Sequence, residues 1–140
     1  MAEDAADLDV LAAAAQDALV HVRELQYDKK ARRFSAFLSR FRWEKANGGG
    51  PYERIRSALS FDGVLGVKSR RFRLDAPDAL ASLLSLEFTP AEEPPAGMVR
   101  LVFAGGGEIA LDVECLDAVL ADVGDPWPTP RRPDHERSGA

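Results

Sequence analysis

The antiparallel character of the chain is clearest in residues 53–73, which have the sequence ERIRSALSFDGVLGVKSRRFR. Every second residue of the first half is suited to one inward face: Ile55, Ser57, Leu59 and Phe61. This alternation predicts a half-buried strand. The pair Asp62-Gly63 follows, and it favours a two-residue type I′ turn because both central positions of that turn need a positive φ. We therefore expect a β-hairpin whose second strand runs from Val64 to about Arg73.

A second hairpin is predicted in residues 98–114, MVRLVFAGGGEIALDVE. Folding this segment about Gly106 places apolar residues opposite one another on one face, namely Phe103 with Ile109, Leu101 with Leu111 and Val99 with Val113. The same register sets Arg100 opposite Asp112 on the other face. Agreement across two strands supports the register, because directly opposed side chains are the unit of sheet stabilisation.

Residues 32–43 predict a long strand whose apolar positions change phase. Phe34, Ala36 and Leu38 occupy even positions, whereas Phe41 and Trp43 occupy odd ones. A period of two cannot change phase without an inserted residue, so we expect a β-bulge near Ser39 and Arg40. Arg40 and Arg42 would then point away from the core. The glycine-rich residues 46–51 that follow predict a loop.

Helices are predicted on both sides of the strands. Residues 4–19 place five apolar residues on one stripe: Leu8, Leu11, Ala12, Ala15 and Leu19. Residues 115–123 carry a similar stripe and end at Gly124, which predicts a short C-terminal helix. The proline-rich residues 125–140 predict an extended tail that is partly disordered.

The expected fold is α+β: an N-terminal helix, about seven antiparallel strands in meander order and a short C-terminal helix. The strands would form a curved sheet or a partly open, pleckstrin-homology-like barrel. Residues 1–124 would make a single globular domain, followed by the tail from residue 125.

Composition excludes several classes of protein. The longest apolar run, residues 10–16, is far too short to cross a bilayer, and the acidic first residues do not resemble a secretory signal, so we expect a cytoplasmic protein. One cysteine and two histidines make a zinc site unexpected. Neither glycine triplet is followed by the Lys-Ser/Thr of a phosphate-binding loop, and no catalytic motif is present. We expect no cofactor and no catalytic residues.

Charge is segregated along the chain, although the formal net charge is only −5. Residues 29–73, called the basic block below, contain thirteen of the eighteen Lys and Arg residues but three acidic ones, a formal charge of +10. The remainder carries −15. The block also contains seven of the eleven aromatic residues, a mixture typical of surfaces that meet nucleic acid or other anions. Equally, the acidic flanks could fold over the block and neutralise it.

One group of arginines is predicted to share an outward sheet face: Arg40, Arg42, Arg54, Arg56 and Arg71. Like charges opposed across strands destabilise a sheet, so a compensating anion is expected. An acidic protein partner, bound by a non-enzymatic adaptor domain, is the leading hypothesis. The alternative is a nucleic-acid-binding protein in which Trp43 or Tyr52 stacks on bases. The protein's own acidic segments are the third source of compensation, since a guanidinium binds carboxylate and phosphate alike. An enzyme with scattered catalytic residues is the least favoured possibility.

Three segments resemble a known family: residues 32–44, which end in Phe-Arg-Trp-Glu, residues 59–70, and residues 101–109 with the Val-Glu-Cys-Leu that begins at Val113. The resemblance is to a bacterial domain of unknown function, numbered twenty-nine forty-eight, and it extends from about Leu8 to Trp127. It implies a bacterial protein with a single domain. It implies no activity, cofactor or site residue.

Overall fold

The computed structural model describes residues 2–45, 52–72 and 76–129. Its elements in chain order are the helix α1 (Ala5–Ala15), β1 (Leu19–His21), the 3-10 helix η1 (Val22–Glu24), β2 (Leu25–Asp28), β3 (Arg33–Phe41), the 3-10 helix η2 (Trp43–Lys45), β4 (Tyr52–Phe61), β5 (Val64–Arg70), β6 (Leu80–Pro90), β7 (Gly97–Phe103), β8 (Glu108–Val113), β9 (Ala118–Asp122) and β10 (Trp127–Thr129). The glycine-rich loop expected at residues 46–51 and the end of the tail, residues 130–140, lie outside the described residues.

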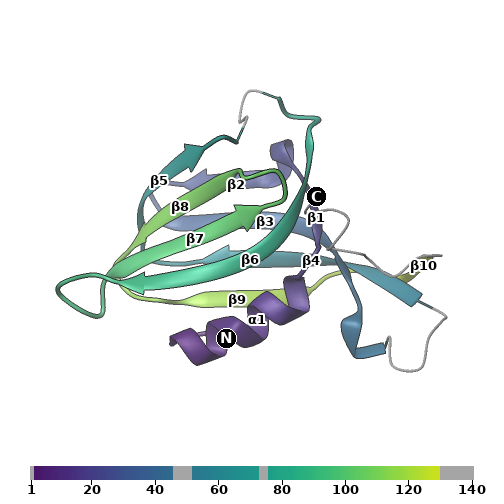
Figure 1. Cartoon of the computed structure of the whole chain (residues 1–140), viewed down its shortest axis with the longest axis horizontal. Coiled ribbons are helices and arrows are strands. Elements are labelled where there is room, and N and C mark those ends of the chain that lie inside the picture. Colours follow the sequence, from purple (N-terminus) through teal and green to yellow (C-terminus); the bar gives the residue numbers. More distant parts are fainter. Residues whose placement is uncertain (1, 46–51, 73–75, 130–140) are drawn as a thin grey trace.

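The strands form one unclosed antiparallel sheet in the order β10-β4-β3-β1-β6-β7-β8-β5, with β2 also pairing with β3 and β9 with β4. β6 belongs to both halves of this sheet. Its first residues, Leu80–Ser82, pair with β1, and from Leu83 onward it pairs with β7. The sheet therefore folds back on itself along β6, and β7 and β8 lie in front of β3 and β4 in Figure 1. An α+β protein with a curved antiparallel sheet is confirmed.

The core fills the space between the two halves of the sheet. Alternate residues of the strands point into it, and its fully buried side chains include Leu59, Phe61, Val64, Val99, Leu101, Ile109 and Leu111. Burial of such side chains supplies most of the folding free energy, at about 1.5–3 kcal/mol each. α1 packs mainly against β6 and also contacts β3 and β9.

The N-terminal helix is confirmed, although it ends earlier than predicted. Its N-cap is Asp4, whose side chain accepts a hydrogen bond of 2.8 Å from the Asp7 amide, an arrangement that satisfies a free donor of the first turn. Leu8 and Ala15 are buried. The helix stops because the chain turns at Asp17, whose φ is +61°, and enters β1. None of the helices in the described part of the chain is long and apolar enough to cross a membrane.

The hairpin of β7 and β8 is confirmed, but its predicted register is wrong by two residues. Leu101 lies opposite Ile109, and Val99 lies opposite Leu111. The Phe103 amide donates to the Gly107 carbonyl at 2.8 Å, so the loop closes around Gly105 rather than Gly106. A shift of two keeps every side chain on its predicted face, which is why the alternation alone could not reveal the error.

The β-bulge predicted near Ser39 and Arg40 is wrong. β3 pairs with β4 in unbroken register from Phe34 opposite Phe61 to Phe41 opposite Arg54. Arg40 therefore keeps the inward phase of Leu38 and is 5% exposed. The apolar positions change phase in the sequence only because Phe41, at the end of the strand, is buried as well. Register shifts occur instead in β5, between Val64 and Gly66, and in β6, between Leu83 and Ser85.

The hairpin predicted at Asp62-Gly63 is also wrong. Gly63 has a φ of +70°, but the φ of Asp62 is not positive, so the turn is not type I′. The inward face predicted for β4 is nevertheless confirmed at Ile55, Ser57 and Leu59. Beyond the turn, β5 leaves β4 and pairs with β8. The chain thereby crosses from one half of the sheet to the other, and the simple meander order is wrong.

The place beside β4 that the predicted hairpin would have filled is taken by β9 and β10. The predicted C-terminal helix is therefore wrong, because residues 118–122 form β9, with Ala118 opposite Phe61. Pairing with β4 satisfies the backbone groups on the side of β4 that faces away from β3. The start of the proline-rich tail forms β10, which extends this edge.

Candidate binding surface

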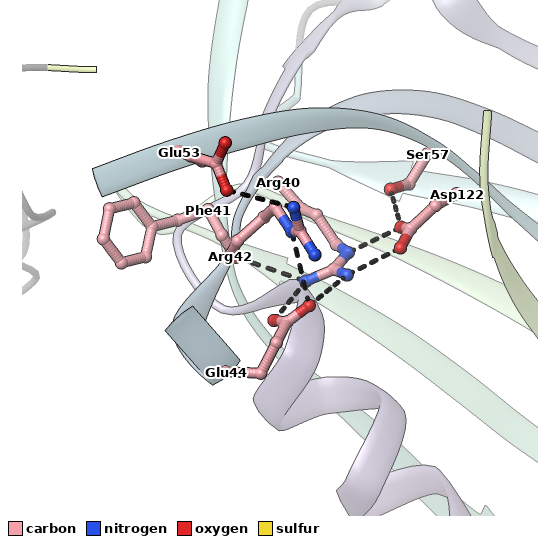
Figure 2. Close-up of polar contacts among 7 residues, drawn as sticks. All are labelled: Arg40, Phe41, Arg42, Glu44, Glu53, Ser57 and Asp122. Atoms are coloured by element: carbon pink, nitrogen blue, oxygen red, sulfur yellow. Dashed lines mark hydrogen bonds and ion pairs between the residues drawn. The ribbon is translucent and has the colours of Figure 1, made fainter. Parts of the chain in front are cut away.

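Arg40, predicted to face outward, is buried at the centre of a cluster of charges. Figure 2 shows its guanidinium between Asp122 of β9 and Glu44 of η2. Its Nε and Nη2 donate to the two carboxylate oxygens of Asp122 at 2.7 Å each. Its Nη1 and Nη2 donate to Glu44 at 3.0 and 2.9 Å. Two bidentate contacts thus satisfy one arginine that is almost inaccessible to solvent.

The cluster strongly favours the ionised form of its members. Hydrogen bonds from Arg40 lower the pKa of Glu44 from 4.5 to about 2 and that of Asp122 from 3.8 to about 2. Ser57 Oγ also donates to Asp122 Oδ1 at 2.6 Å. The same hydrogen bonds raise the pKa of Arg40. Arg40 is therefore a permanently charged connection between β3, β9 and η2.

Arg42 and Arg56 are bound by carboxylates of the same protein. Arg42 Nη1 donates to Glu53 at 3.0 Å, as Figure 2 shows. Arg56 forms an ion pair with Glu24, and its guanidinium carbon lies 5.6 Å from the centroid of the Phe37 ring. Neither arginine therefore requires an external anion.

Arg54 lies next to this region and is half-buried. Its Nη1 donates to the Ser39 carbonyl at 3.0 Å. Burial lowers the pKa of Arg54, while the negative charge of Asp17 opposes that shift. β4 therefore presents Arg54 and Arg56 on its predicted outer face, but both are engaged within the protein.

The two aromatic residues proposed for stacking pack against a buried ring. The Phe41 ring centroid lies 4.6 Å from that of Trp43 and 5.7 Å from that of Tyr52. Trp43 Nε1 donates to the Gln16 carbonyl at 3.1 Å, which ties η2 to the end of α1. The contacts of both rings are those of a structural aromatic cluster.

Arg71 differs from the other four predicted arginines. It is exposed, has a φ of +53°, and lies directly after β5 beside the glycine turn. Its carbonyl oxygen would be 2.8 Å from a Cβ atom at Gly107, so only glycine permits this approach. No described residue forms an ion pair with Arg71.

Two further cations accompany Arg71, and the sequence analysis did not single them out. Lys68 and Arg70 are exposed on β5, and neither has an ion-pair partner among the residues that the structure describes. We call Lys68, Arg70 and Arg71 the basic edge. The signal for it was present in the sequence as Lys-Ser-Arg-Arg, but the partner strand of β5 was needed to show that these residues lie at the margin of the sheet.

The carboxylates that bind arginines of the basic block come from three parts of the chain. Within the block, Glu44, Glu53 and Asp62 bind Arg40, Arg42 and Arg33. Glu24 comes from the N-terminal side, and Asp122 and Glu114 come from the C-terminal side, where Glu114 binds Arg32. Within the described residues, the protein's own carboxylates therefore bind five of the thirteen cations of the block, and all five are arginines. Asp122 could not be assigned to Arg40 from the sequence because it was expected on a helix.

The described part of the chain contains no group of three or more His, Cys, Asp or Glu residues that could hold a metal ion.

A comparison with protein families matches residues 1–135 to a protein of unknown function (DUF2948). A search of curated proteins found no match. The chain belongs to this family of unknown function, as its resemblance indicated.

Proposed function

We propose that this member of a family of unknown function is a non-enzymatic binding or adaptor domain that recognises an acidic protein partner. The basic edge is the surface we assign to that partner. The proposal is supported by a contrast between two sets of cations. Arg40, Arg42 and Arg56 bind carboxylates of their own chain, whereas the three cations of the basic edge are exposed and have no ion pair to a described residue.

Such a surface suits carboxylates for a physical reason. Exposed cations steer an acidic partner toward the protein and fix its orientation, while contributing modestly to affinity. The partner in this proposal contacts Lys68, Arg70 and Arg71. Arg71 is one of the five arginines that the sequence predicts for a binding surface. Arg40, Arg42, Arg54 and Arg56 lie outside this surface, because their contacts are with groups of their own chain.

Binding of labelled poly-glutamate peptide, measured by fluorescence anisotropy, tests this function. We expect the wild-type protein to bind, and the double variant Lys68→Glu with Arg70→Glu to bind about tenfold more weakly or not at all. The matched control is Lys29→Glu with Lys30→Glu, which makes the same change in net charge at an exposed turn. An equal loss in both double variants would contradict an assigned surface, because it would report only the overall charge.

Labelled single-stranded RNA, titrated at about 50 and 200 mM salt, tests the alternative function. Preference for RNA over poly-glutamate, with a steep salt dependence, would favour a nucleic-acid-binding protein. That protein would use the same basic edge, because a guanidinium binds phosphate through the same planar fork as carboxylate.

We further propose that the curved sheet is a partly open, pleckstrin-homology-like barrel, supported by the sharing of β6 between its two halves. In this proposal residues 1–124 form one domain, and the protein is a cytoplasmic protein of bacterial origin. Limited proteolysis tests the domain boundary: a stable fragment that ends near residue 124 would support it, whereas protection of β10 as far as Thr129 would contradict it. Fractionation of cells tests the location.

A further inference from the structure

β5 is a terminal strand of the sheet. It pairs with β8 on one side only. Within the described residues, no backbone hydrogen bond reaches Leu65–Arg70 from the other side. A terminal strand of this kind presents a row of backbone N–H and C=O groups to which a further strand can be added.

The outer face beside this open edge is hollowed. The register shift between Val64 and Gly66 leaves Leu65 without an opposite residue on β8, and its side chain is 52% exposed. The small residues Gly66 and Ala110 line a hollow of about 120 Å³, whose other lining residues are Val67, Lys68, Met98 and Asp112. This hollow shares Met98 with a groove of about 620 Å³ that runs over β5, β8 and β7. An apolar side chain of a neighbouring strand has space here.

Charge restricts the kind of strand that the edge accepts. Lys68 and Arg70 are exposed on the same strand and carry no ion pair to a described residue, and Arg71 follows directly. A second copy of β5 would place these cations against their own kind, which destabilises a strand pair. An acidic strand would instead oppose each of them with a carboxylate.

We propose that β5 binds an extended acidic segment of the partner protein as an additional strand of the sheet. The inference rests on the proposed function and specifies how the acidic partner binds. Backbone hydrogen bonds to β5 would provide affinity, and alternate side chains would provide specificity. Acidic side chains of the segment lie beside Lys68 and Arg70, and one apolar side chain enters the hollow near Gly66.

The test uses a pool of synthetic nine-residue peptides in which two residues of one strand face are Glu or Asp, the next residue of that face is Val, Leu or Phe, and the residues of the other face are Thr or Val. Amide hydrogen exchange of the full-length protein is followed by NMR with and without the pool. We expect amides of β5 that exchange rapidly in the free protein to become protected at least tenfold. A matched pool, N-methylated at alternate residues, keeps its charge but cannot complete the strand pairing and should give no protection. A pool in which Lys replaces the acidic residues should not bind.

The outcomes separate this inference from the proposed function. One result would overturn strand addition and leave the proposed acidic partner in place. In that result the acidic pool binds and the binding is lost in Lys68→Glu with Arg70→Glu, but β5 is not protected or the N-methylated pool binds equally strongly. Absence of binding by the acidic pool, or equal binding by the Lys pool, would overturn both. Binding of single-stranded RNA at β5 in place of the acidic pool would overturn both as well.

Gly66→Val provides a second, independent measurement. A Cβ atom at Gly66 would meet no heavy atom within 4 Å, so the variant should fold normally, and valine suits a strand. The added side chain narrows the hollow. We expect peptides with Phe at the position beside Gly66 to bind Gly66→Val about fivefold or more weakly than wild type. Peptides with Ala at that position should bind both proteins alike. Equal affinity of the Phe peptides for both proteins would refute the placement of a side chain in the hollow.

Discussion

The buried arginine of β3 allows a sharp test of how this fold tolerates charge. Single changes Asp122→Asn and Glu44→Gln each remove one of the two carboxylates that bind Arg40. We expect each to lower the free energy of unfolding by about 1–2 kcal/mol. The losses are modest because one carboxylate remains, and because the side chains of Asp122 and Glu44 are already 39% and 50% exposed.

Combining the two changes should cost more than their sum. The side chain of Arg40 is only 7% exposed, so without either carboxylate its charge is buried and uncompensated. Loss of all partners of a buried ion typically costs about 3–5 kcal/mol. Adding Arg40→Met to the double variant removes that charge while keeping an apolar side chain of similar length. We therefore expect the triple variant to be more stable than the double variant by about 1–3 kcal/mol.

Urea denaturation, followed by tryptophan fluorescence and by circular dichroism, measures these differences. The control is Asp62→Asn, which removes the partner of the exposed Arg33 and should leave the free energy of unfolding unchanged within the error of the curve. The reasoning would be refuted if Arg40→Met destabilised the double variant further. Such a result would mean that Arg40 stabilises the fold through contacts other than its two carboxylates.

Three further outcomes are expected in the same denaturation assay. The pKa values of Glu44 and Asp122 fall to about 2 on folding, from 4.5 and 3.8. Their contribution to the free energy of unfolding should therefore be complete above about pH 4.5 and disappear as the pH drops toward 2. After solvent screening we expect this loss to be about 1–2 kcal/mol, and the Asn and Gln variants should lack it. Gly107→Ala should destabilise by about 1–3 kcal/mol, because its Cβ atom would lie 2.8 Å from the Arg71 carbonyl oxygen, whereas Gly66→Ala should change the stability by less than about 0.5 kcal/mol; equal effects would contradict the crowded turn. Trp43→Phe removes the hydrogen bond to the Gln16 carbonyl and should cost about 0.5–1.5 kcal/mol, and no loss would show that this bond contributes nothing.

Local alternation was sufficient to predict which faces of β4, β7 and β8 point inward. Ile55, Ser57 and Leu59 were assigned correctly, because a strand alternates whichever strand lies beside it. Alternation does not show which strand lies beside a given strand in the sheet. β5 follows β4 after a two-residue turn and yet pairs with β8, while the edge of β4 is taken by β9, which comes much later in the chain. The apolar stripe of residues 115–123 fitted a helix, and the open side of β4 made it a strand.

The candidate surface could be predicted only in part, because the sequence does not show which distant residues come into contact. Segregation of charge identified the basic block, but neutralisation depends on contacts between distant residues, such as Arg40 with Asp122, which are 82 positions apart. The period of two placed Arg40 on the inward phase of Leu38, but its charge suggested an outward position and the predicted bulge followed from that choice. The basic edge could be recognised only after the ion pairs elsewhere in the block had been placed.

Ala2 and Ala118 form an isolated antiparallel bridge, with backbone hydrogen bonds of 2.7 and 3.0 Å. The first described residue is thus held by a strand near the end of the chain. During synthesis the bridge at Ala2 cannot form until β9 has emerged, and one side of β4 stays open for the same period. Contacts of such high sequence separation slow folding. The nascent protein therefore passes through a stage in which its longest exposed edge is β4 rather than β5, and it relies on late residues to protect that edge from pairing with other chains.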